Sequence, residues 1–340
     1  MALQAAQPVQ VDDIALIGGG PVGLFGAFYA GLRGLKTRLF ESLPQLGGQL
    51  TALYPEKFIY DVPGFPRVQA KVLVAQLVEQ AMQFNPQVML NTPVTGLQQR
   101  PDGGIFVLTT ARGVFFAKVV IVTAGLGAFS PKKLAAPGVA EFEGKGVHYW
   151  LDDLSRFRGR RALVVGGGDS AVDFALMLQP VARHVTLIHR RDGFRAHEQS
   201  VKQLYASGVE VLVFHELKRL EGGEAVERAV VFDNRTGAER VLDVQHVVFA
   251  LGFSADLGPM REWGLELEDE AIRVNSFKME TAVAGVYAAG DIATYPGKVK
   301  LIATGFGEVA TAVNNACRYI DPSLPVFPGH SSNRKSAGQR

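Results

Sequence analysis

Cysteine is almost absent from this chain of 340 residues, which contains only Cys317. A single cysteine excludes an intramolecular disulfide and a C-x-x-C redox pair, and its apolar, helix-like sequence context favours a place in the core. None of the 7 histidines has metal-ligand spacing, and no serine, histidine and aspartate set indicates a hydrolytic triad. We therefore expect no metal site and no hydrolase-type nucleophile.

An excess of charge is also missing. The 35 basic and 33 acidic residues give a net charge of +2, which is too balanced to indicate nucleic acid binding. The first residues, MALQAAQPVQVDD, carry neither the basic nor the apolar segment of a signal peptide. Residues 14–32 are uncharged and long enough to cross a bilayer, but their glycines follow a strand–turn–helix pattern. We expect a cytoplasmic protein with no nucleic acid or membrane partner.

The first motif with a chemical meaning lies in residues 14–41. An apolar strand leads into a G-x-G-x-x-G turn and an apolar helix, and the next strand ends at an acid. Such glycines permit a tight turn, a close approach of backbone N–H groups to a pyrophosphate and close helix packing, while the acid accepts ribose hydroxyls. The pattern predicts a dinucleotide site formed by Gly18, Gly20, Pro21, Gly23 and Glu41. The alternative is a glycine-rich turn of another α/β protein.

A second copy of the pattern begins with the strand at residues 162–165. Its G-x-G-x-x-A turn contains Gly166, Gly168, Ser170 and Ala171. The strand at residues 185–188 ends in a basic cluster instead of an acid: His189, Arg190, Arg191 and, shortly after, Arg195. Arginine pairs with a 2′-phosphate, which an acid would repel. The second site is therefore predicted to bind NADP(H), and the alternative for the arginines is a solvated surface cluster.

The two copies predict an α/β fold with two Rossmann-like dinucleotide-binding domains of the three-layer ββα type, each with an inserted β-meander. Turn signals inside residues 97–110 and at residues 234–237 mark the two meanders. A length of 340 residues also favours two domains. We expect a discontinuous FAD-binding domain at residues 1–125 and 284–340, and an NADP(H)-binding domain at residues 126–283.

Two adenine-nucleotide sites in one chain indicate electron transfer between two cofactors. One is a nicotinamide, and the other is most simply FAD, because a long loop rich in glycine, proline and aromatic residues follows Glu41. Asp291 follows a buried strand in GVYAAGD and is expected to accept a ribityl hydroxyl. The alternative is that Asp291 only caps this region.

The motifs GGGDSA, HRRDGFRA and AAGD resemble those of the thioredoxin-reductase-like flavoproteins over nearly the whole chain. Those disulfide reductases carry a C-x-x-C before the second glycine motif, where this sequence has VHYWLDDL. The chain therefore resembles a subgroup without the dithiol, the ferredoxin/flavodoxin–NADP reductases of the thioredoxin-reductase-like type. The strings LYPEKFIYDVPGFP, GAFSPKKL and GKVKLIATGFGEVATAVNNA carry this resemblance.

The resemblance implies an activity in which NADPH transfers a hydride to FAD and one-electron steps then reduce a ferredoxin or flavodoxin. It also implies a homodimer in which the C-terminal tail covers the flavin of the partner chain. Tyr54 and His330 would stack on the flavin ring. The remaining implied FAD contacts, besides Glu41, are Gln49, Val94, Phe129, Asp291 and Ser332.

Two other functions stay open from the sequence. The protein could be a non-catalytic flavin- and NADP-binding sensor, or an NADPH-dependent reductase of a separate disulfide protein. Likewise, Tyr54 could be an ordinary loop tyrosine and His330 a dispensable tail residue.

Overall fold

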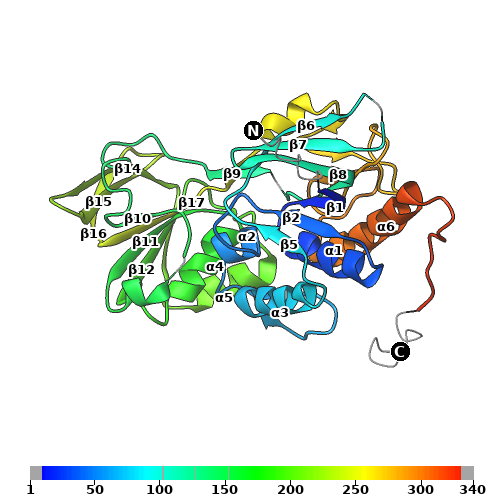
Figure 1. Ribbon diagram of the computed structural model, residues 1–340. Helices are drawn as coiled ribbons and strands as arrows, with labels where there is room; N and C mark the ends of the chain where they lie inside the picture. Colours follow the sequence, from blue (N-terminus) through cyan, green and yellow to red (C-terminus); the bar gives the residue numbers. More distant parts are fainter. Residues whose placement is uncertain (1–9, 102, 126, 152, 331–340) are drawn as a thin grey trace, which may run out of the picture. The chain divides into compact units, whose positions relative to one another are not determined.

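The computed structural model describes residues 10–101, 103–125, 127–151 and 153–330 (Figure 1). The chain forms two compact units. Unit 1 comprises Met1–Thr51, Phe58–Ala128 and Ala255–Arg340, and unit 2 comprises Ala52–Lys57 and Phe129–Ser254. The chain passes between the units in strands β9 (Ala128–Pro131) and β18 (Phe253–Asp256), which pair with each other.

Unit 1 contains a seven-stranded sheet in the order β5-β2-β1-β8-β7-β6, with β21 also paired to β8. Strands β5, β2, β1, β8 and β21 pair in parallel, while β6, β7 and β8 form the predicted meander with antiparallel pairing. The strands are β1 (Val11–Ile17), β2 (Thr37–Phe40), β5 (Gln87–Met89), β6 (Val94–Gln99), β7 (Phe106–Thr110), β8 (Gly113–Val122) and β21 (Val286–Ala288).

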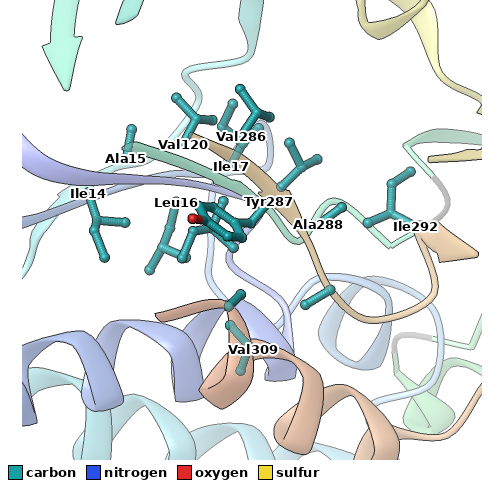
Figure 2. Close-up of a cluster of buried hydrophobic side chains, with 14 of the residues drawn as sticks. Ile14, Ala15, Leu16, Ile17, Val120, Val286, Tyr287, Ala288, Ile292 and Val309 are labelled. Atoms are coloured by element: carbon teal, nitrogen blue, oxygen red, sulfur yellow. The ribbon is translucent and has the colours of Figure 1, made fainter. Parts of the chain in front are cut away.

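Three helices of unit 1 lie on one side of this sheet (Figure 1). They are α1 (Pro21–Leu32), α3 (Ala70–Met82) and α6 (Ile302–Ile320). Figure 2 shows the reason: Leu16 of β1 and Tyr287 of β21 point toward Val309 of α6, whereas Ala15 and Val286 point to the opposite side. The alternation follows from the period of two along a strand, and all five side chains are buried.

Shorter elements complete unit 1. The hydrophobic residues Leu257, Met260, Trp263 and Leu265, which follow β18, pack in its core. For this reason the chain returns to unit 1 at Ala255, which differs from the boundary expected at residue 284. The short elements are α2 (Gln49–Ala52), β3 (Phe58–Ile59), β4 (Val68–Gln69), a 3-10 helix at Gly258–Glu262, β19 (Leu267–Glu268), β20 (Ala271–Arg273) and β22 (Ala293–Thr294).

Unit 2 contains a five-stranded parallel sheet in the order β10-β17-β11-β12-β13. Its meander, β14-β15-β16, is a separate antiparallel sheet, unlike the meander of unit 1. Both sheets are built from β10 (Val147–His148), β11 (Arg161–Gly166), β12 (His184–His189), β13 (Glu210–Val213), β14 (His215–Gly222), β15 (Val226–Asp233), β16 (Glu239–Asp243) and β17 (His246–Ala250). The helices are α4 (Asp169–Leu178), α5 (Glu198–Ala206) and a 3-10 helix at Leu154–Phe157.

The α/β fold with two parallel sheets and two meanders confirms the prediction, and every strand and helix named from the sequence is present within a few residues. Helix α5 was missed, because among its residues only Leu204 is fully buried and the pattern is therefore weak. In the part of the chain that the structure describes, no helix is both long and apolar enough to cross a bilayer.

Candidate functional site

The glycine turn of unit 1 joins β1 to α1. Gly18 has φ +112°, and a Cβ atom there would lie 2.5 Å from the carbonyl oxygen of Thr123. A Cβ atom on Gly23 would overlap the carbonyl oxygen of Gly18. Both glycines are therefore required by the chain itself, since one permits the turn and the other lets α1 sit on it.

Gly20 is different, because the protein does not require a glycine there. It has an ordinary φ of −71° at the N-cap of α1, and the nearest atom to a Cβ at this position is 4.0 Å away. No side chain caps the helix at this residue. Helix N–H groups thus point out beside an open space, which is the arrangement that binds phosphate. The space a side chain would fill is available to a pyrophosphate.

Glu41 follows β2 directly and is 5% exposed. Its Oε2 accepts a hydrogen bond from the N–H of Gly19 at 2.8 Å, and its Oε1 accepts one from the N–H of Leu43 at 2.9 Å. The carboxylate therefore holds the glycine turn against the end of β2, a role that the sequence did not indicate. Oε1 also accepts from the Ser42 hydroxyl at 3.2 Å, whereas Oε2 retains a second lone pair for a ribose hydroxyl, and that contact remains a prediction.

The glycine turn of unit 2 repeats this geometry. A Cβ atom on Gly166 would overlap the carbonyl oxygen of Ala250 and lie 2.9 Å from the Cβ of Ala171. A Cβ atom on Gly168, the N-cap of α4, would meet nothing within 4 Å. The predicted residue Ser170 lies in the first turn of α4. The second motif therefore shares the crowded first glycine and the open helix N-cap position of the first, while alanine is accepted where the first has Gly23.

His189 occupies the place in unit 2 that Glu41 occupies in unit 1, beside the middle glycine of the turn. A Cβ on Gly167 would overlap the His189 ring, just as a Cβ on Gly19 would lie 3.0 Å from the Glu41 carboxylate. The ring stacks on Phe194 with centroids 5.1 Å apart. Burial is the largest effect on the His189 pKa and lowers it, and three neighbouring arginines lower it further. The imidazole is therefore neutral at pH 7.

The basic cluster lies beside this turn. Arg190, Arg191 and Arg195 are exposed, and their side chains make no hydrogen bond or ion pair with the residues that the structure describes. Backbone bonds hold the segment in place: the N–H of Arg195 donates to the carbonyl of Gly167 at 2.8 Å, and Asn234 Nδ2 donates to the carbonyl of Arg190 at 2.9 Å. The fold thus presents three guanidinium groups without an ion-pair partner among the described residues, next to the N-terminus of α4, which has the geometry of a phosphate-binding helix N-terminus.

The FAD contacts that the resemblance implies lie in several separate elements of the chain. Asp291 is half-buried in the turn after β21, Val94 is buried at the start of β6, and Gln49 begins α2. Tyr54 belongs to unit 2, where it packs against the core of that unit and lies under Lys57 at 5.7 Å from the ring centroid. Its stacking on a flavin stays a prediction.

Three further predicted contacts concern the linker and the tail. The structure does not describe the side chain of Phe129, although its backbone belongs to β9. His330 is exposed and packs edge-to-face on Phe327 with centroids 5.4 Å apart. Ser332 lies outside the described residues. Their roles toward a flavin also stay predictions.

Residues 12–316 match the family described as pyridine nucleotide-disulphide oxidoreductase. The chain belongs to this family. It is 56% identical to the ferredoxin–NADP reductase of Symbiobacterium thermophilum over 96% of this chain and 98% of that protein. It is 52% identical to the ferredoxin–NADP reductase of Geobacillus kaustophilus over 95% of this chain and 97% of that protein.

Solved structures of thioredoxin reductases have the same fold. The enzyme of Lactococcus lactis in its FR conformation aligns with a TM-score of 0.78 and 26% identity over 91% of this chain and 99% of that one. The enzyme of T. acidophilum gives a TM-score of 0.78 and 25% identity over 92% and 98%. The resemblance stated from the sequence is thus confirmed.

The family description mentions disulphides, but this chain cannot form one internally. Its single cysteine, Cys317, is 1% exposed within α6. Burial raises the pKa of the Cys317 thiol, so the reactive thiolate is disfavoured. Cys317 is a core residue, as expected.

Proposed function

We propose that the protein is an FAD-containing NADPH reductase that transfers electrons between NADPH and a ferredoxin or flavodoxin. The observation that carries the proposal is the difference between two otherwise equivalent turns: Glu41 beside the first, and neutral His189 with three free arginines beside the second. The relatives that are more than half identical, named ferredoxin–NADP reductases, support the same activity.

Unit 1 is the proposed FAD site and unit 2 the proposed NADP(H) site. Gly20 and Gly168 would each leave room for a pyrophosphate at a helix start, and Arg190, Arg191 and Arg195 would pair with the 2′-phosphate. When bound, FAD supplies the conversion between two-electron and one-electron transfer. We further propose that the protein is a cytoplasmic homodimer.

The proposal is tested by a choice of electron acceptors. We expect purified holoprotein with NADPH to reduce ferricyanide, a one-electron acceptor, and to leave an aromatic disulfide reagent unreduced above the background rate. The reason is that the chain has one cysteine, and that cysteine is buried. Rapid disulfide reduction without ferricyanide reduction would contradict the proposal and favour a disulfide reductase. The absence of both activities would favour a sensor.

Hydrogen bonds hold the start of the C-terminal tail against α1. Arg33, which caps α1, donates to the side-chain oxygen of Asn314 and, at 3.2 Å each, to the carbonyls of Pro325 and Val326. Arg33 is the C-cap of α1, so residues 325–326 are held at the end of this helix opposite the glycine turn. The role of His330 at the flavin of a partner chain stays part of the proposal.

Truncation after Phe327 tests the tail. If His330 occupies the flavin face that the nicotinamide needs, we expect the truncated enzyme to be reduced by NADPH at an equal or higher rate, while turnover with ferredoxin changes. Arg33→Ala, which keeps the tail but frees its anchor, should shift both rates in the same directions by a smaller factor. Stopped-flow absorbance measures the first rate and steady-state assay the second. Unchanged rates in both half-reactions would show that the tail is dispensable.

A further inference from the structure

A buried ion pair lies beside the turn that carries Asp291. Lys298 and Glu308 have side chains only 6% and 5% exposed, and the Lys298 ammonium binds Glu308 Oε1. The hydroxyl of Tyr295 donates to the same oxygen at 2.7 Å. Burial and this hydrogen bond raise the pKa of Tyr295 to about 12, so the phenol keeps its proton. We call Tyr295, Lys298 and Glu308 the buried polar triad.

The buried polar triad holds both backbone groups of one residue, Gly290. The N–H of Gly290 donates to Glu308 Oε2 at 2.8 Å, and its carbonyl accepts from Lys298 Nζ at 3.0 Å. Gly290 has φ +83°, a conformation that favours glycine. Asp291 comes next, half-buried, and its carboxylate makes no hydrogen bond to the described part of the chain. The triad thus fixes the peptide immediately before a free carboxylate.

The same turn packs against the starts of two helices. A Cβ atom on Gly290 would lie 3.2 Å from Val22, in the first turn of α1, and one on Gly305, in the first turn of α6, would overlap the same side chain and approach Gly290 Cα at 3.3 Å. Glu308 lies one turn further along α6. The triad therefore sets the distance between the phosphate-binding start of α1, the start of α6 and Asp291.

Net stability is a poor explanation for this arrangement. The cost of removing two charges from water generally cancels the attraction within a buried ion pair, and apolar residues of similar size often stabilise as well. What the pair supplies is a defined geometry, because its oxygens and its ammonium group satisfy a specific N–H, a specific carbonyl and a specific hydroxyl.

We propose that Tyr295, Lys298 and Glu308 are positioning residues that hold the Gly290–Asp291 turn and the start of α6 in the geometry that retains FAD. This inference rests on the proposed function, because it assumes that FAD occupies unit 1. The positioning acts through the Gly290 peptide, and none of the three side chains needs to touch the cofactor.

The sequence offers a matched control in the same unit. Arg38 and Asp12 form a second buried ion pair, at 2.6 Å with 10% and 3% exposed side chains. Asp12 lies near the start of β1 and Arg38 near the start of β2, whereas Gly290 lies two residues after the end of β21. Breaking this pair should also destabilise the fold, but it leaves the Gly290 turn intact.

The experiment compares Lys298→Met, Glu308→Gln and Tyr295→Phe with Asp12→Asn, all as purified holoproteins. The rate of FAD release after dilution is followed by the rise in flavin fluorescence, and thermal midpoints are measured on the same samples. We expect release to be about tenfold faster in Lys298→Met and Glu308→Gln than in Asp12→Asn at an equal loss of thermal midpoint. Tyr295→Phe keeps the ion pair, so it should fold normally and release FAD a few-fold faster than wild type.

The outcomes separate the inference from the function it rests on. Two results together would overturn the positioning role. Tyr295→Phe would release FAD at the wild-type rate, and the ion-pair variants would release FAD no faster than Asp12→Asn does at the same loss of thermal midpoint. The reductase proposal would still stand. A wild-type protein that retains no FAD would refute the proposed function and, with it, this inference.

Discussion

Replacing Arg190 and Arg191 together by alanine should raise the KM for NADPH by about 100-fold or more and leave the KM for NADH nearly unchanged. Each hydrogen bond from a charged group is worth about 1.5–3 kcal/mol, and about 1.4 kcal/mol corresponds to a factor of ten. The structure supports the prediction because these guanidinium groups are exposed and carry no internal ion pair in the part of the chain that is described. They are free to bind a phosphate, and their removal breaks no hydrogen bond or ion pair within the described residues.

A control distinguishes a specific phosphate contact from general charge. Arg158 and Arg183 are also exposed arginines of unit 2, but they lie near the beginnings of β11 and β12, at the opposite end of the strands from Gly166 and His189. Arg158→Ala with Arg183→Ala should leave the ratio of the two KM values unchanged. Steady-state kinetics with both coenzymes gives the result. An equal rise with NADPH and NADH in the Arg190 and Arg191 variant would show that these arginines are not phosphate ligands.

The second large effect is a loss of cofactor affinity when a glycine at the start of α1 or α4 is replaced by alanine, which adds one methyl group. Gly20→Ala should weaken FAD retention, and Gly168→Ala should raise the Kd for NADP, each by roughly 5- to 150-fold, the factor that corresponds to an overpacking cost of about 1–3 kcal/mol. Both residues have φ values open to alanine, −71° and −100°, and a Cβ atom there meets no protein atom closer than 4.0 Å. In the proposed complexes, the methyl group would meet the pyrophosphate.

The two variants serve as controls for each other. Gly20→Ala should leave NADP binding intact, Gly168→Ala should leave FAD bound, and neither should lower the thermal midpoint of the cofactor-free protein. Gly23→Ala marks the contrast, because its Cβ would overlap the Gly18 carbonyl and should destabilise unit 1 itself. Flavin fluorescence and calorimetric titration with NADP measure both affinities. Full FAD and NADP binding by the two alanine variants would contradict the placement of the phosphates.

Local patterns were sufficient to predict the two glycine turns and the elements around them. The glycines, the apolar strand before each turn and the residue after the second strand stand at fixed spacings, and pairing of Ile17 with Phe40 and of Val165 with Ile188 brings them together. The sequence could not show that the Glu41 carboxylate accepts a hydrogen bond from the Gly19 N–H, because that contact depends on the exact register in which β1 and β2 pair. The strand–turn–helix geometry of both turns was therefore predictable, but its internal support was not.

Contacts between distant segments could not be predicted from the sequence either, because they depend on the tertiary structure and not on a local pattern. Lys298 and Glu308 are far from Gly290 in sequence by local standards, and no local pattern shows that they bind the two sides of its peptide. Arg33 likewise binds residues almost 300 positions away. The return to unit 1 at Ala255 was not predicted, because the Gly258–Pro259 turn and the apolar residues after β18 do not indicate which core they join.

The most direct test of the account is NADPH-dependent reduction of a purified iron–sulfur ferredoxin under anaerobic conditions. The FAD-loaded enzyme is added in catalytic amounts, and the loss of visible absorbance of the ferredoxin measures its reduction. The account predicts many turnovers per enzyme with NADPH, far fewer with NADH, and loss of the preference for NADPH in the Arg190 and Arg191 variant. If NADPH reduced the bound flavin while neither ferredoxin nor flavodoxin accepted electrons from it, the proposed function would be contradicted.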